Sequence, residues 1–247
     1  MHGSRMKRPL ALAVAAATLA AVLAGGSSAA RAPGAPAAGA SASRSLVFSH
    51  PRDIDNRYLP LTAHRRCVYR GESTDGVPER TVLTRLDRTR RFTIAGRPVD
   101  AAVFSDVAFE GGKHVETAID YFAQADDGTV YYLGELVSNI KNGKVVDTEG
   151  SWLLGRDTDV PGVAMPGTLH VGDRWHFEDV PGVTTESDRV EERDLRIKAA
   201  GRIFTGVVRV QEFTQPEGEL EYKLYAAGAG IIVSYDPESR TELVGCS

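Results

Sequence analysis

Two short segments of this chain place acidic side chains opposite each other across a predicted turn. Residues 115–123 and 130–137 are rich in β-branched and aromatic side chains, and Asp127-Gly128 lies between them. This pattern is typical of two antiparallel strands joined by a two-residue turn. The turn would pair Asp120 with Glu135 across the strands. Two opposed carboxyl groups can bind a cation, hydrogen-bond a polar ligand, or share a proton as an acid/base couple.

The alternation of side chains along these strands predicts a polar face around the acidic pair. Because successive side chains of a strand point to opposite faces, Glu116, Asp120, Gln124, Tyr131 and Glu135 are expected together. Opposed like charges cost about 0.2–1 kcal/mol, so a sheet seldom pairs them without compensation. Three hypotheses stay open: the acids solubilise an exposed face, bind a ligand in a concave pocket, or catalyse proton transfer.

Other chemistry receives little support from the sequence. The region after residue 30 contains no G-x-S-x-G, H-E-x-x-H or C-x-x-C motif and no phosphate-binding glycine loop. Its histidines show no ligand spacing, and Asp157 and Asp159 lack the remainder of a helix–loop–helix calcium site. We therefore expect no metal and no cofactor, and the sequence leaves open whether the protein is an enzyme.

The first thirty residues predict export. Arg5, Lys7 and Arg8 precede an apolar run at 9–24, and Ser28-Ala29-Ala30 resembles a cleavage site, which together are typical of a secretory signal peptide spanning 1–30. No second long apolar run follows, so no membrane span is expected in the mature chain. Residues 31–47 are rich in Ala, Pro, Gly and Ser and predict a disordered leader. We expect a secreted, extracellular protein.

Charge and length limit the partners and the domain count. Cleavage after residue 30 would remove three cations and no acids, which takes the formal charge from −4 to −7. The one basic cluster, residues 85–91, is interrupted by Asp87, so nucleic acid is not an expected partner. Residues 48–247 are expected to form a single β-rich domain. The sequence does not indicate an oligomeric state.

The two cysteines predict a disulfide bond. Cys67 lies in the first strand-like segment of the domain and Cys246 in the last. In an oxidising compartment a lone pair of cysteines is expected to be bridged. Such a bridge would join the beginning of the domain to its end.

A period of two dominates the rest of the chain and predicts an all-β fold. The strand-like segments are bounded by Gly, Pro, Asn or Asp, which indicates turns between antiparallel strands. Residues 187–197 are also interpreted as a strand. We expect an antiparallel meander that forms a strongly curved sheet or a near-closed barrel. The clearest segments are 81–84, 92–94, 115–123, 130–137, 207–213, 220–225 and 231–235.

An ordered series of short motifs resembles a group of exported bacterial proteins that are mostly described as hypothetical. The series covers nearly everything from Phe48 to Val244, and it implies a secreted β-rich domain without implying a reaction. Where the group is expected to have Pro-Gly after Leu-Pro-Leu, this chain has Thr62-Ala63-His64. The motifs are residues 55–61, 116–117 with 120–124, 128–135, 150–152, Pro161-Gly162 with Met165-Pro166, and Gly172-Asp173.

These observations favour a non-enzymatic exported domain that binds a small amphipathic molecule or a component of the cell envelope. Candidates to line a pocket of the curved sheet are Trp152, Trp175, Phe122, Tyr131 and Met165. The alternative is that these large side chains simply fill the core. One alternative is a cofactor-independent enzyme that uses Asp120 and Glu135 on a sugar-like or polyketide-like substrate. Another is a passive interaction module of the envelope.

Overall fold

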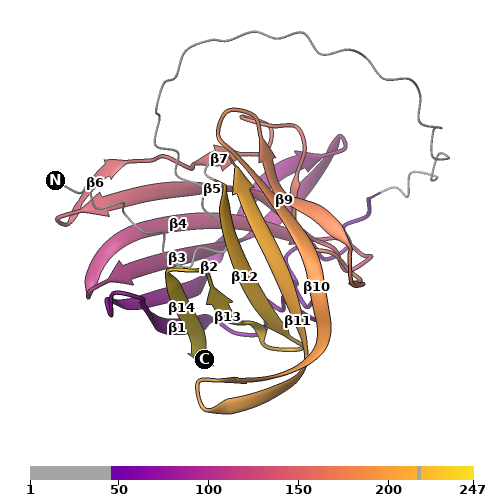
Figure 1. Cartoon of the computed structure of the whole chain (residues 1–247). Helices are drawn as coiled ribbons and strands as arrows, with labels where there is room; N and C mark the ends of the chain where they lie inside the picture. The colour runs from indigo at the N-terminus through magenta and orange to yellow at the C-terminus, as the bar shows by residue number, and fades with distance from the viewer. Residues whose placement is uncertain (1–45, 216–217) are drawn as a thin grey trace, which may run out of the picture.

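The computed structural model describes residues 46–215 and 218–247, and the predicted signal peptide lies outside them. The described residues form fourteen strands in one antiparallel sheet (Figure 1). This confirms the predicted all-β, antiparallel class. No helix of the described chain has the length and apolar character that crossing a bilayer requires. Of the predicted leader, Leu46 packs against the domain, and the carbonyl of Val47 accepts a hydrogen bond from the backbone of Asp126.

The first half of the chain forms a meander in which each strand pairs with the next. Two short strands that follow it, β7 and β8, both pair with β5. The members of this half are β1 (Arg66–Ser73), β2 (Pro78–Ile94), β3 (Arg97–Glu110), β4 (Lys113–Gln124), β5 (Val130–Lys141), β6 (Lys144–Asp147), β7 (Trp152–Leu153) and β8 (Gly162–Met165).

The second half forms another meander, whose strands cross the direction of β3–β5 in Figure 1. The predicted strand at 187–197 lies within β10 of this half. Its members are β9 (Arg174–Val180), β10 (Thr184–Ala199), β11 (Arg202–Gln215), β12 (Glu219–Ala226), β13 (Gly230–Tyr235) and β14 (Ser239–Cys246).

The first and last strands join the two meanders at the middle of the sheet. β1 pairs with β14, and Cys67 lies directly opposite Cys246 with the predicted disulfide between them at an S–S distance of 2.03 Å. The path of paired strands therefore ends at β6 on one side and β9 on the other. The expectation of a strongly curved sheet or near-closed barrel is not supported, because the β1–β14 pair lies within the sheet and leaves two mid-chain strands as its ends.

Two apolar clusters lie on the two faces of the first meander. The larger one contains side chains of both meanders, among them Phe104, Tyr132, Phe177 and Val208. The smaller cluster lies on the opposite face of β2–β5 and includes Tyr121. The larger cluster is thus the main core. Polar side chains on the strand faces directed toward this core are buried.

The disulfide should contribute strongly to stability. Because it joins residues 179 positions apart, chain-entropy arguments assign it about 5 kcal/mol through restriction of the unfolded chain. We expect the double variant Cys67→Ser/Cys246→Ser to lose about 2–5 kcal/mol of unfolding free energy, measured by urea denaturation followed by tryptophan fluorescence. Coincident urea midpoints for the variant and the oxidised wild type would contradict this expectation.

Candidate functional site

Asp120 and Glu135 are cross-strand neighbours, as the sequence predicts, although the turn between their strands is longer than predicted. Gln124 pairs with Val130, and the backbone of Ala125 donates to the carbonyl of Thr129 at 2.9 Å. The prediction of a two-residue turn at Asp127-Gly128 is therefore wrong, because the loop spans residues 125–129. This shift would have separated the two acids had the strands remained regular.

A bulge in β5 restores the pairing. Phe122 lies opposite Tyr132, yet two residues further along β4 Asp120 lies opposite Glu135, so β5 contains one extra residue. Gly134 occupies this irregular stretch with a φ of 122°, and a Cβ there would collide with the carbonyl oxygen of Trp152. Glycine therefore permits both the bulge and the close approach of β7.

The acidic pair is almost completely removed from solvent. Asp120 is 1 % exposed and Glu135 is 0 % exposed. The hydroxyl of Tyr132 donates to Oδ1 of Asp120 at 3.0 Å. Among the described residues, Oδ2 of Asp120 and Nε1 of the adjacent Trp152 have no hydrogen-bond partner. The carboxyl oxygens of Glu135 have none of ordinary geometry, although the hydroxyl of Tyr132 is near enough to lower the pKa of Glu135 against the larger effect of burial. These are carboxyl groups in an apolar setting rather than solubilising surface acids.

Burial controls the protonation of the pair. Loss of solvation raises the pKa of Asp120 to about 7, against the opposing effect of the hydrogen bond from Tyr132. The pKa of Glu135 is raised well above its usual value, first by burial and then by the nearby charges of Glu178, Asp120 and Glu116. The pair therefore keeps at least one proton at neutral pH.

Aromatic side chains surround the pair on the core side. The ring of Tyr132 stacks on Phe122 with centroids 4.8 Å apart. It contacts Phe177 of the second meander at 5.0 Å and Trp152 edge to face at 5.4 Å. The polar atoms of the site thus lie at the border of an aromatic cluster.

The structure brings together some of the predicted site residues and separates others. Glu116 is buried on the same face as the acidic pair, and Trp152 lies directly opposite Glu135. Gln124 instead contacts the segment that precedes β1: its side-chain oxygen accepts a hydrogen bond from the backbone N–H of Asn56 at 2.9 Å. Tyr131 belongs to the other face, where its ring lies 5.7 Å from that of Phe48. Because the longer turn shifts the pairing near it by one residue, Tyr132 rather than Tyr131 lies on the face of the acidic pair.

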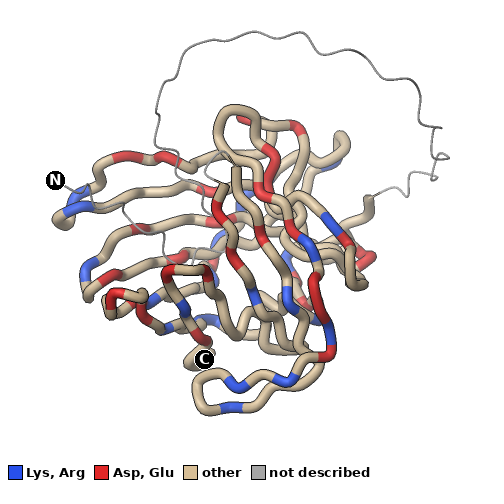
Figure 2. Tube along the Cα trace, in the orientation of Figure 1, with Lys and Arg blue, Asp and Glu red and all other residues tan. Residues whose placement is uncertain are grey.

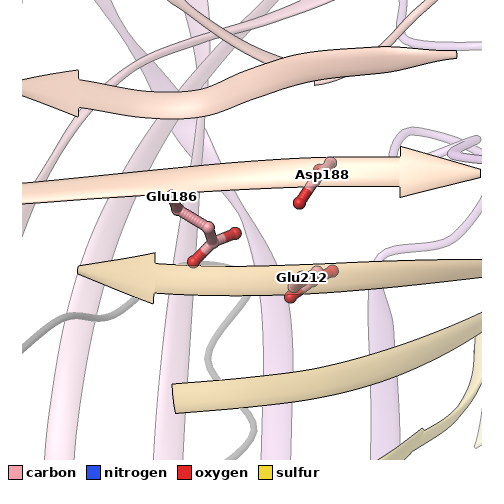
Figure 3. Close-up of side chains that lie close together, drawn as sticks. All are labelled: Glu186, Asp188 and Glu212. Carbon is pink, nitrogen blue, oxygen red and sulfur yellow. The ribbon is translucent and has the colours of Figure 1, made fainter. Parts of the chain in front are cut away.

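A second group of buried acids lies on the other meander. Glu186, Asp188 and Glu212 each offer a carboxylate oxygen, and these oxygens lie within 4.8 Å of one another. Figure 3 shows the three side chains close together on the neighbouring strands β10 and β11. Asp188 and Glu212 are cross-strand partners, and the hydroxyl of Thr214 donates to Glu186 at 3.4 Å.

Lys223 on β12 supplies a cation to this second group. Its Nζ donates to Oε2 of Glu212 at 2.5 Å, and both side chains are 2 % exposed. Burial by itself would lower the pKa of Lys223, but Glu212, Glu221 and Glu186 raise it well above its usual value. In the described chain Lys223 is the one lysine or arginine that is buried.

Glu178 lies between the two groups of acids. It is buried on β9, pairs across the strands with Glu186, and its charge acts on both Glu135 and Tyr132. Acidic residues recur along the strands of both meanders in Figure 2. The interior therefore contains a band of carboxyl groups that reaches from β4 to β11. We call this band the interior acidic band; it consists of Glu116, Asp120, Glu135, Glu178, Glu186, Asp188 and Glu212.

Sequence reasoning missed the second meander's share of this band. The alternation of side chains already indicated that these acids are buried. Val208 and Val210 precede Glu212 on one face of β11. Glu186 and Asp188 precede Val190 on one face of β10. Acids that continue an apolar face are expected to be buried. Their pairing could not be deduced, since the β10–β11 register shifts at three places between the acids and the hairpin turn.

A pocket lies on the core side of β3, next to the acidic pair. Phe104 lines it and is the cross-strand partner of Asp120. The ring of Phe104 lies 5.8 Å from that of Phe122. One aromatic side chain thus adjoins both the pocket and a buried carboxyl group. The other lining residues include apolar Leu61, Leu83 and Ile231 and basic Arg65, Arg66 and Arg85.

The fold and site define an all-β protein with an acidic interior. Comparisons with models of protein families, with curated proteins and with solved structures find no match. The resemblance to exported bacterial proteins consequently stays a prediction.

The raised pKa values predict that stability falls as pH rises. The folded protein retains protons on Asp120 and Glu135 that the unfolded chain releases above about pH 4, so folding is most favourable at or below that pH. Stability should decrease as pH increases toward about 7, where Asp120 titrates, with Asp120 alone contributing on the order of 4 kcal/mol. The charged or titratable neighbours facing the pair are Tyr132, Glu116 and Glu178.

Urea unfolding at a series of pH values tests this expectation. Asp120→Asn should flatten the pH dependence, whereas Glu149→Gln, which alters an exposed carboxyl group, should leave it unchanged. An Asp120→Asn curve parallel to that of the wild type would contradict the assignment.

Lys223→Met should destabilise the protein by about 3–5 kcal/mol, because Glu212 would lose its buried ammonium partner. The matched control is Arg65→Met, which removes the cation of the Arg65–Asp87 pair, whose side chains are 68 % and 75 % exposed. That exposed pair is expected to contribute less than about 1 kcal/mol. Equal losses in the two variants, measured by urea denaturation, would show that burial of the Lys223–Glu212 pair has no special weight.

Proposed function

We propose that this chain is an exported domain that binds a small amphipathic ligand, whose cationic or hydrogen-bond-donating head contacts Asp120 and whose apolar part occupies the adjacent pocket. The observation that carries the proposal is the direct opposition of Phe104, which lines the pocket, and Asp120, whose Oδ2 lacks a donor. A ligand that reaches past Phe104 would satisfy this oxygen.

The chemistry of the lining supports an amphipathic ligand. Leu61, Leu83 and Ile231 give the pocket apolar walls, and Arg65, Arg66 and Arg85 add polar groups to its lining. The carboxyl group beyond Phe104 adds one polar anchor. A few polar groups at the end of an apolar pocket give orientation and specificity to a bound amphiphile.

Export accords with the disulfide. Structural disulfides form and persist in oxidising compartments, and this one joins the first and last strands. The predicted signal peptide supplies the route to such a compartment. The ligand would then be an extracellular small molecule or a component of the cell envelope.

Acid/base catalysis on a sugar-like or polyketide-like substrate is a second candidate function. It is favoured by the different protonation of the two carboxyl groups, since Asp120 titrates near pH 7 while the pKa of Glu135 is raised further by its acidic neighbours. Such a pair can accept and donate a proton at neutral pH. Turnover of aryl glycosides that is lost in both Asp120→Asn and Glu135→Gln would favour it over binding alone.

Calorimetric titration with octylamine and with octanol tests the binding proposal on the full disulfide-bonded domain. Octylamine should bind more tightly than octanol, because only the amine places a cation beside Asp120. Asp120→Asn should weaken octylamine binding at least tenfold, the loss expected for a charge-assisted hydrogen bond of about 1.5 kcal/mol or more. Native mass spectrometry of the protein from culture supernatant would identify a retained natural ligand.

Two variants separate the pocket from the carboxyl group. Leu61→Trp fills the pocket without altering Asp120 and should abolish binding of both probes, while the exposed variant Glu149→Gln should bind both as the wild type does. Equal affinity of the wild type and Leu61→Trp would overturn the assigned pocket. If neither probe binds and native mass spectrometry finds no retained molecule, a passive interaction module of the envelope would be favoured.

A further inference from the structure

We propose that Glu186, Asp188 and Glu212 form a binding site for a divalent cation, most suitably Ca²⁺, on the second meander. This site is separate from the pocket beside Asp120 and does not depend on the function proposed above. It was not expected from the sequence, which offered no ligand spacing for a metal.

The oxygens of the three side chains have suitable mutual distances. One carboxylate oxygen from each lies within 4.8 Å of the other two. Three points so spaced lie at most about 2.8 Å from a common centre, and small side-chain adjustments would reach the 2.3–2.6 Å that Ca²⁺–oxygen contacts require. Adjacent strands hold the carboxylates, because Asp188 and Glu212 are direct cross-strand partners.

Asp188 provides an independent indication that a ligand belongs here. Its side chain is 2 % exposed and points into the group in Figure 3. Neither of its carboxylate oxygens has a hydrogen bond of ordinary geometry within the described residues. The indole of Trp175, its cross-strand neighbour, is near enough to lower the pKa of Asp188, but burial and the charges of Glu212 and Glu186 outweigh this effect and raise that pKa. Oε1 of Glu212 is likewise buried without a donor. Buried carboxylate oxygens usually contact donors or metal ions.

The charge balance favours a multivalent cation. With Lys223 bound to Oε2 of Glu212, the three carboxylates and the one ammonium carry a formal charge of −2 when all are ionised. Glu221, which lies opposite Glu212 and also acts on Lys223, adds a further negative charge when it is ionised. A buried set of charges is tolerated when it is paired, and a divalent cation would offset most of this excess.

The donor set selects calcium among divalent ions. All three ligands are carboxylates, and Thr214 already donates to Glu186 at the edge of the group. Hard oxygen ligands favour Ca²⁺ or Mg²⁺ over zinc, which prefers nitrogen and sulfur. A site whose ligands lack octahedral arrangement favours Ca²⁺ over Mg²⁺, and water would complete the six to eight oxygens that Ca²⁺ takes.

Thermal unfolding of the full, disulfide-bonded protein provides the first test. After treatment with EDTA and dialysis, CaCl₂ at about ten times its dissociation constant should raise the midpoint by about 3–6 °C. Asp188→Asn should remove this shift, and Glu212→Gln provides a second ligand variant if the first fails to fold. Asp120→Asn should retain the shift, so loss of the ligand site beside Asp120 and loss of the metal site are distinguishable.

Terbium luminescence provides a second test that leaves the ligands intact. Tb³⁺ replaces Ca²⁺ at oxygen sites, and excitation of a nearby tryptophan sensitises its emission. Because Trp175 lies opposite Asp188, bound Tb³⁺ should emit on tryptophan excitation, and CaCl₂ should displace it. Trp175→Phe should reduce this emission several-fold while preserving the thermal shift with CaCl₂.

Three results would overturn the proposal. One is an EDTA-treated wild type that shows neither a thermal shift with CaCl₂ nor sensitised Tb³⁺ emission. Another is a folded Asp188→Asn variant with the same shift as the wild type. The third is undiminished Tb³⁺ emission in Trp175→Phe, which would place the ion elsewhere in the protein.

Discussion

The constraint on which this structure depends is the burial of more carboxyl groups than cations inside one sheet. An isolated carboxylate cannot leave water without a large penalty, so each buried acid must hold a proton, a positive partner or strong hydrogen bonds. The first meander relies on protons, as the raised pKa values of Asp120 and Glu135 indicate. On the second meander burial also raises the pKa values of Asp188 and Glu212, and the ammonium group of Lys223 is bound to Glu212 in addition. Retained protons thus act on both sides of the acidic interior, and a buried cation acts on one.

Ordinary strand geometry is enough to place the acids in this interior. On β11, Val208 and Val210 face the main core, and Glu212 continues the same face two residues later. Alternation therefore buries an acid wherever an apolar series ends in one. The acidic pair needed an additional device, because the longer turn at 125–129 shifts the register and the bulge at Gly134 shifts it back. A local irregularity with no apolar signature of its own consequently decides whether Asp120 and Glu135 meet.

Sequence reasoning anticipated what local patterns determine. The strands and the Cys67–Cys246 bond follow from alternation and from the expected compartment. The Asp120–Glu135 pairing was predicted from a two-residue turn, and it is present because the bulge in β5 compensates for the longer loop. The predicted face of Tyr131 was wrong, because the prediction depended on a turn length that the Asp127-Gly128 dipeptide does not determine. Lys223 escaped notice because a lone lysine in a strand is ordinarily exposed. Contacts between the meanders, such as that of Tyr132 with Phe177, depend on the whole sheet and have no local signal.

The pairing of β1 with β14 gives the acidic band a further property. Each acidic group is assembled by a hairpin, β4–β5 for Asp120 with Glu135 and β10–β11 for Asp188 with Glu212, so each needs only local contacts to form. Burial is different, because the main core contains side chains of both meanders and exists only when they pack together. The raised pKa values arise chiefly from burial, so uptake of protons is coupled to packing of the meanders rather than to formation of the hairpins. Any cation or ligand that neutralises the band would act on that same packing step, which links binding in the interior to the stability of the whole sheet.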